Sequence, residues 1–167
     1  MPIALPKLLE LIQKANKRKP PFHGTLLAVD PGETTGVTVI SAGVHHCDLV
    51  IQDQLTTWPI EQAVHNFTNE FQISLPTHVV FESYYVYSWR LQEHKFNEVP
   101  TIQIIGCLKT LCIQRGIPYD SQNAQTGKAF FTDDMLKKLN MYYEGQPHAR
   151  DSLRHACQFL MFGTTQK

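Results

Sequence analysis

The sequence predicts an α/β domain built on a five-stranded mixed sheet with helices on its faces. Two observations favour this class. Three short apolar segments, residues 25–30, 35–41 and 46–54, follow one another closely enough to form an antiparallel meander. Helical patterns then alternate with two further apolar segments, residues 77–82 and 117–120. That order is typical of units that place successive strands in parallel.

The N-terminal segment is amphipathic and basic. Its apolar residues recur at helical spacing: Leu5, Leu8, Leu9 and Ile12. Residues 1–20 hold five basic side chains and one acid, a net charge of +4, and the neutral total therefore leaves −4 on the rest of the chain. We predict a basic helical extension over residues 1–23 and a folded domain over 24–167. The extension is either a docked helix with solvated lysines or a basic arm that contacts phosphates or a partner.

The meander contains the most unusual stretch of the chain, "LAVDPGETTGVTVI" at residues 27–40. The first apolar strand ends at Asp30, Pro31-Gly32 makes a tight turn, and the second strand follows. An Asp before Pro-Gly is ordinary turn chemistry. Asp30 therefore has a structural explanation as well as a functional one.

The chain after the meander supplies four further helical patterns. Pro59 suits the first turn of a helix over residues 58–71, and Pro147 suits the start of another over 147–162. Two more helical patterns lie between these: residues 98–115 and 132–139.

Composition excludes several classes of protein. Hydrophobic residues make up 43% and charged residues 18%, which is typical of a globular domain. No apolar run approaches the ~18 residues of a membrane span, and no signal-peptide pattern opens the sequence, so we expect a soluble, cytoplasmic protein. The four cysteines form no C-x-x-C pair, which argues against a zinc site and for reduced thiols. Equal numbers of acidic and basic residues are unusual for a nucleic-acid binder.

Asp30 and Glu82 each end a predicted strand. If those two strands are parallel neighbours, their ends lie about one strand spacing apart, ~4.8 Å. Two carboxylates at that distance repel each other unless a positive charge lies between them. Oxygen ligands without cysteine favour Mg²⁺ or Mn²⁺ over zinc.

The last helix adds two candidates near its start. His148 and Asp151 are three residues apart and project from one side of the helix. Asp151 either complements the helix dipole or is a third carboxylate of the site. His148 could orient water, deprotonate it or bind a metal. Arg154 and His155, one turn later, either tune Asp151 or lie on the surface. Such a cluster suits two-metal phosphodiester hydrolysis.

Three motifs in this order resemble the RuvC-type Holliday-junction resolvases of the RNase H-like (retroviral integrase) superfamily. They are "LAVDPGETTGVTVI", "VVFES" and "HARDSLRHA", and the resemblance spans about residues 24–163. It implies an RNase H-like fold and a homodimeric endonuclease that cuts four-way DNA junctions with two Mg²⁺ or Mn²⁺ ions per active site. The compact size of the chain leads us to expect a phage version of the family. The resemblance also implies that Asp30, Glu82 and Asp151 are catalytic metal ligands, with His148 as a ligand or as the base.

The resemblance also suggests DNA contacts. An aromatic residue three positions after the second acid serves as a wedge between bases in that family, and Tyr85 has this position in "ESYYVYSWR". Tyr84 is a second stacking candidate. Basic residues that could contact phosphates are Lys128, Lys137, Arg90 and Arg150. The alternative for the aromatic residues is the core, and for the basic ones a solvated surface.

Two other functions stay open at this point. The domain could be another RNase H-like nuclease that acts on RNA–DNA hybrids or flaps, or a non-catalytic DNA-binding domain of the same fold. An actin-like ATPase also uses glycine turns after its first strand, but it needs two such domains, and 167 residues provide one.

Overall fold

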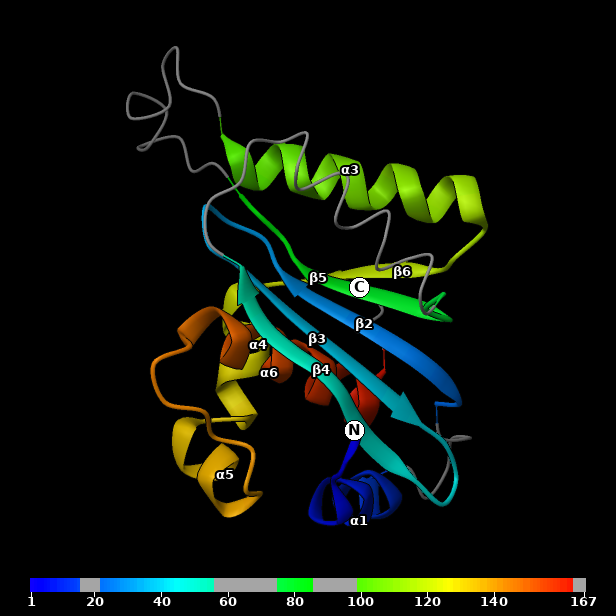
Figure 1. Cartoon of the computed structure of the whole chain (residues 1–167), viewed down its shortest axis with the longest axis vertical. Coiled ribbons are helices and arrows are strands. Elements are labelled where there is room, and N and C mark those ends of the chain that lie inside the picture. Colours follow the sequence, from blue (N-terminus) through cyan, green and yellow to red (C-terminus); the bar gives the residue numbers. More distant parts are fainter. Residues whose placement is uncertain (16–21, 56–74, 86–98, 164–167) are drawn as a thin grey trace.

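The computed structural model describes residues 1–15, 22–55, 75–85 and 99–163, and these form a mixed sheet with helices on both faces (Figure 1). The strands β2 (Gly24–Asp30), β3 (Thr35–Ala42) and β4 (Cys47–Leu55) make the predicted antiparallel meander. The strand β5 (His78–Glu82) pairs in parallel with β2, and β6 (Tyr119–Gln122) pairs in parallel with β5. The predicted fold class is confirmed.

The sheet contains one strand more than predicted. Its order is β1-β4-β3-β2-β5-β6, and the sixth strand is β1 (Ile3–Ala4), which pairs antiparallel with β4. Two residues are too few to show an alternating pattern in the sequence, and this strand forms only because the edge of β4 offers free backbone groups.

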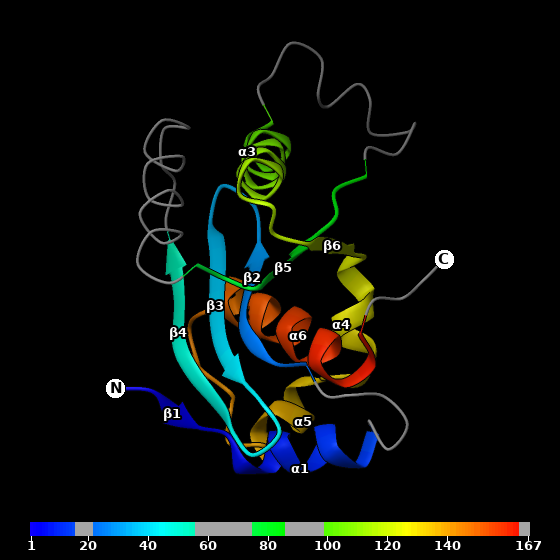
Figure 2. The same ribbon diagram turned by 90° about the vertical axis from the view of Figure 1, so that its right-hand side faces the viewer.

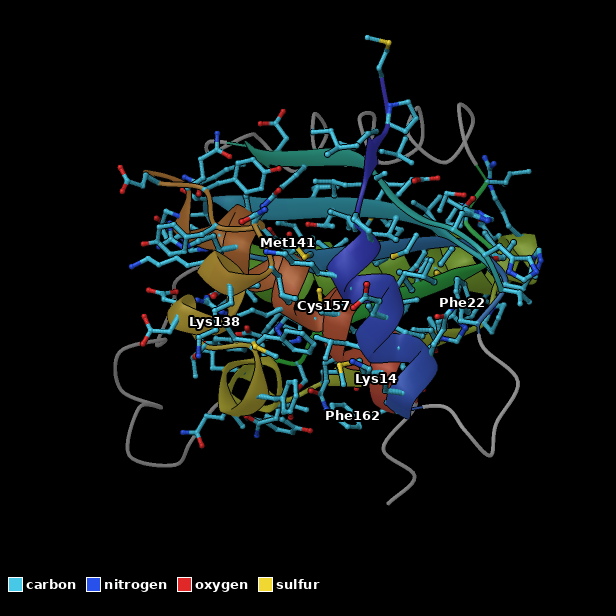
Figure 3. The ribbon with its side chains drawn as sticks, turned by 90° about the horizontal axis from the view of Figure 1, so that it is seen from below. Lys14, Phe22, Lys138, Met141, Cys157 and Phe162 are labelled. Carbon is cyan, nitrogen blue, oxygen red and sulfur yellow. The ribbon has the colours of Figure 1, made fainter. Side chains whose placement is uncertain are left out.

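The expected N-terminal helix is α1 (Pro6–Ala15), and it is docked rather than free. Leu8 and Ile12 are buried, and α1 contacts the last helix, α6 (Pro147–Phe162). Figure 3 shows α1 in front of α6 on this side of the molecule. The boundary at residue 23 stays a prediction.

The helices divide between the two faces of the sheet (Figures 1 and 2). α3 (Pro100–Arg115) lies on one side, and α6 lies on the other with α4 (Ala124–Phe130) and α5 (Asp133–Lys138). The helix α4 was not predicted: it has seven residues and begins where the side chain of Asn123 accepts a hydrogen bond from the backbone of Gln125. The helix predicted over residues 58–71 lies outside the described residues.

Strand alternation decides which face each acid meets. Leu26 and Ala28 of β2 belong to the core that includes α6, whereas Leu27 and Val29 belong to the core under α3. Because both faces are covered, β2 is apolar almost throughout. Asp30 follows Ala28 by two residues and so points to the α6 side.

The helix α6 presses closely on the sheet. A Cβ added to Gly36 of β3 would lie 1.9 Å from the carbonyl oxygen of His148, so only glycine fits there. Farther along, the hydroxyls of Thr38 and Ser152 form a buried hydrogen bond of 2.7 Å. These contacts fix the start of α6 over the end of β2 and the start of β3.

Two simpler expectations concern cysteines and membranes. All four cysteines are free thiols, and Cys47, Cys112 and Cys157 are buried. Within the described part of the chain, no helix has the length and apolar character needed to cross a membrane.

Candidate active site

Two of the three acids predicted for the site, Asp30 and Glu82, lie at the ends of neighbouring strands, and the third, Asp151, lies on α6. Because Val29 pairs with Phe81, the next residues on the two parallel strands, Asp30 and Glu82, end side by side. In the strand register, Asp30 pairs with Gly36 of β3, which pairs with Gln54 of β4. On the other side, Glu82 pairs with Gln122 of β6. The expected neighbourhood of strands β2 and β5 is therefore confirmed.

Asp30 is the most buried of these acids, with 7% of its surface exposed. Burial and the nearby Glu82 carboxylate raise the pKa of Asp30 to about 6, although the His148 ring opposes part of this rise. The Nδ1–H of His148 donates to Oδ2 of Asp30 over 2.8 Å. Asp30 thus holds a negative charge at neutral pH in a place that disfavours it.

His148 is held from both its backbone and its ring. Its backbone N–H donates to Oε1 of Gln54 on β4 at 3.1 Å, which satisfies one of the free N–H groups at the start of α6. Its ring is partly exposed and is oriented by Asp30. Since Nδ1 carries the proton toward Asp30, Nε2 of a neutral ring is left as an acceptor.

Glu82 has a different histidine as its partner. His155, which is 1% exposed, places Nε2 at 3.1 Å from Oε2 of Glu82 and Nδ1 at 2.8 Å from Oε1 of Gln122. Gln122 in turn donates to the backbone carbonyl of His155. Both ring nitrogens of His155 therefore contact side-chain oxygen atoms. Gln122 thus positions the His155 ring, and the ring orients the Glu82 carboxylate.

Asp151 faces α4 and α5 rather than His148. Arg154 donates to its Oδ1, and Lys128 Nζ lies 2.8 Å from its Oδ2. Arg154 also pairs with Asp133 and donates through Nε to the carbonyl of Phe131 at 2.8 Å. Asp151 still raises the pKa of Asp30, so the two carboxylates are within electrostatic reach.

The donor set suits a hard cation, but the three carboxylates do not converge in this structure. Among the described residues, no three His, Cys, Asp or Glu side chains meet closely enough to hold a metal ion. Asp30 and Glu82 are oxygen donors whose mutual repulsion is only partly compensated by His148, which fits Mg²⁺ or Mn²⁺. Both carboxylate oxygens of Asp151 are paired with cations, Oδ1 with Arg154 and Oδ2 with Lys128.

The residues predicted to contact DNA differ in their exposure and in their distance from the acids. Tyr85 is 54% exposed just after β5, and Tyr84 beside it is half-buried. Lys128 lies beside Asp151, as described above. Arg90 is outside the described residues.

The other two predicted phosphate contacts converge on one aromatic ring. The ammonium of Lys137 and the guanidinium of Arg150 each lie 4.8 Å from the centre of the Tyr142 ring. Arg150 also donates to the carbonyl of Tyr143 at 2.6 Å, so part of its hydrogen-bonding capacity is spent within the protein.

Four polar residues of the site were not assigned a firm role from the sequence: Gln54, Gln122, Arg154 and His155. A surface position for Arg154 and His155 was one expectation, and it is wrong, because both are buried. A signal existed in their spacing, since Arg154 lies one turn after Asp151. No sequence spacing marks Gln54 and Gln122 as site residues, because only strand pairing places them beside Asp30 and Glu82.

Comparisons with known proteins agree on the fold. No protein-family model and no curated protein sequence matches this chain. RuvC from Thermus thermophilus, solved with a Holliday junction substrate, has a TM-score of 0.66 at 16% identity and covers 83% of this chain and 94% of its own. The yeast mitochondrial Holliday junction resolvase Ydc2 has a TM-score of 0.61 at 11% identity, with 94% and 92% covered.

A viral enzyme extends the comparison. The fowlpox virus resolvase, solved in complex with Holliday junction DNA, has a TM-score of 0.52 at 13% identity and covers 81% of this chain and 97% of its own. Similarity at these identities concerns the path of the backbone rather than the chemistry. The chain therefore has the fold of RuvC-type Holliday junction resolvases.

Proposed function

We propose that this protein is a divalent-metal-dependent endonuclease that resolves branched DNA, specifically four-way Holliday junctions, as a two-fold homodimer. The observation that carries the proposal is the placement of Asp30 and Glu82 side by side at the ends of parallel strands, with Asp151 within electrostatic reach. The likeness to resolvases that were solved with junction DNA supports the choice of substrate.

In this proposal Asp30, Glu82 and Asp151 hold two Mg²⁺ or Mn²⁺ ions. The ions would supply activation of the attacking water and stabilisation of the leaving oxygen. The buried Asp30 carboxylate provides the strongest pull on a cation, because the cation removes the repulsion from Glu82. His155 and Gln122 keep Glu82 facing the site.

His148 is assigned the role of base. Its Nδ1–H is fixed on Asp30, so the free electron pair of the neutral ring is at Nε2, on a partly exposed ring. A water molecule can therefore give its proton to Nε2 while Asp30 keeps the ring oriented. Tyr85 is assigned to base stacking, because it is the exposed aromatic residue next to Glu82 in the part of the chain that the structure describes.

The test is cleavage of a labelled synthetic four-way junction, with linear duplex, a flap and an RNA–DNA hybrid run in parallel. Paired nicks at symmetric positions of the junction are the expected result, since a two-fold enzyme meets a nearly two-fold substrate. Cutting of the hybrid or flap alone would move the function to another RNase H-like nuclease. Tight junction binding without cutting would favour a non-catalytic DNA-binding domain, for which the two cations on Asp151 are the supporting observation.

A further inference from the structure

Two cations of different kinds neutralise Asp151. Arg154 has a side chain that is 9% exposed, and it is fixed by Asp133 and by the carbonyl of Phe131 as well as by Oδ1 of Asp151. Lys128 has a side chain that is 51% exposed and reaches Oδ2 of Asp151 at 2.8 Å. One cation is built into the structure, and the other reaches the carboxylate from solvent.

The position of Lys128 is set by the packing of α4 on α6. A Cβ added to Gly127 would lie 2.9 Å from Cβ of Arg154, so the backbone of α4 touches α6 directly before Lys128. Lys128, Arg150 and Asp151 also line an open pocket of about 540 Å³. The lysine therefore lies where an incoming phosphate can reach it while it still covers Asp151.

The two ion pairs differ in how easily they exchange. An ion pair with an exposed lysine contributes little to stability, and its partner can be replaced by another anion at small cost. If Arg154 moved away from Asp151, Asp133 and the backbone carbonyl of Phe131 would lose their hydrogen-bond donor as well. When Lys128 moves away, Oδ2 becomes available to a divalent cation while Oδ1 stays on Arg154.

We propose that Lys128 is a gating counter-ion that couples DNA binding to metal binding. In the DNA-free protein its ammonium occupies Oδ2 of Asp151 and competes with the divalent cation. A DNA phosphate draws the ammonium away, and Asp151 then joins Asp30 and Glu82. The proposal rests on the function proposed above and adds its regulation: the site binds metal tightly only when DNA is present. By linkage, the metal strengthens DNA binding by the same factor.

The test measures metal binding rather than cleavage. Mn²⁺ is titrated calorimetrically into DNA-free wild type, Lys128→Met and Lys128→Arg, with Lys109→Met on α3 as a control for the loss of one positive charge. We expect Lys128→Met to bind Mn²⁺ about fivefold more tightly than wild type, since it loses one exposed competing ion pair. Lys128→Arg and Lys109→Met should bind Mn²⁺ like wild type.

A second titration tests the coupling itself. Ca²⁺, which takes the same oxygen ligands, is titrated into wild type and Lys128→Met with and without saturating four-way junction. The junction should increase the Ca²⁺ affinity of wild type about fivefold more than that of Lys128→Met.

The outcomes separate the two proposals. Equal Mn²⁺ affinities for wild type and Lys128→Met, with binding that Asp30→Asn abolishes, would overturn the gating role and leave the metal site in place. Mn²⁺ binding that Asp30→Asn does not weaken would overturn the metal site itself, and the gating role with it.

Discussion

Replacing Asp30 by Asn should stabilise the metal-free protein at pH 8. The pKa of Asp30 rises from its ordinary value of 3.8 to about 6 on folding, mainly because of burial and then because of Glu82. The folded protein thus binds this proton more tightly than the unfolded chain does. The resulting contribution to stability is complete below pH 4 and is lost as the pH rises through 6.

The size of the effect follows from that rise in pKa. A change from 3.8 to about 6 corresponds to about 3 kcal/mol between the protonated and the ionised carboxyl group. An amide removes the charge and keeps an oxygen that can accept from Nδ1 of His148. We therefore expect Asp30→Asn to gain about 1–3 kcal/mol in the free energy of unfolding at pH 8 and almost nothing at pH 4.

Urea unfolding followed by far-ultraviolet circular dichroism, in EDTA at pH 4 and pH 8, measures this difference. The control is Asp53→Asn, an exposed acid on β4, which should give the same stability difference from wild type at both pH values. Mg²⁺ should then stabilise the wild type and not Asp30→Asn. A variant that is less stable than wild type by the same amount at pH 4 and pH 8 would refute the reasoning.

Three further predictions test other parts of the structure. Gly36→Ala should destabilise the protein by about 3 kcal/mol or more, since its Cβ meets the backbone of α6; the control Gly106→Ala, with open space around it, should be neutral or slightly stabilising in the same thermal melt. Arg154→Met should cost about 1–3 kcal/mol in urea unfolding, because it leaves the buried carbonyl of Phe131 without its donor and Asp151 with the exposed Lys128 alone; an unchanged midpoint would contradict the role of this residue as an anchor. Tyr85→Ala should weaken junction binding about tenfold in a gel-shift titration and leave the melting temperature unchanged, while Tyr85→Phe should bind like wild type; equal affinities for all three proteins would exclude stacking.

The sequence was sufficient for the parts of the fold that depend on local pattern. Apolar runs and turn residues predicted the meander and β5, and Pro147 predicted the start of α6. The adjacency of Asp30 and Glu82 was expected on the condition that their strands are parallel neighbours, and the pairing of β2 with β5 confirms that condition.

The elements that were missed depend on tertiary contact. The strand β1 has two residues and exists only against β4, and α4 has seven residues around a glycine. The burial of Arg154 and His155 was missed for another reason: α6 is covered on almost every side, so its polar residues do not mark a solvent face.

Asp151 shows how far sequence analysis of the site could go. Its place near the start of the last helix was predicted, but its orientation toward Arg154 and Lys128 was not. The orientation depends on α4, which supplies Lys128, and on α5, whose Asp133 holds Arg154. No spacing within α6 encodes it.

Cleavage of a four-way junction by four proteins tests the central claim most directly. Wild type, Asp30→Asn, Glu82→Gln and Asp151→Asn are compared in Mg²⁺, in Mn²⁺ and in EDTA. We predict paired symmetric nicks with wild type in either metal, no nicks in EDTA, and no nicks with any of the three variants in Mg²⁺. Nicking that persists in EDTA, or that survives the loss of the Asp30 carboxylate, would contradict a metal site built on these carboxylates.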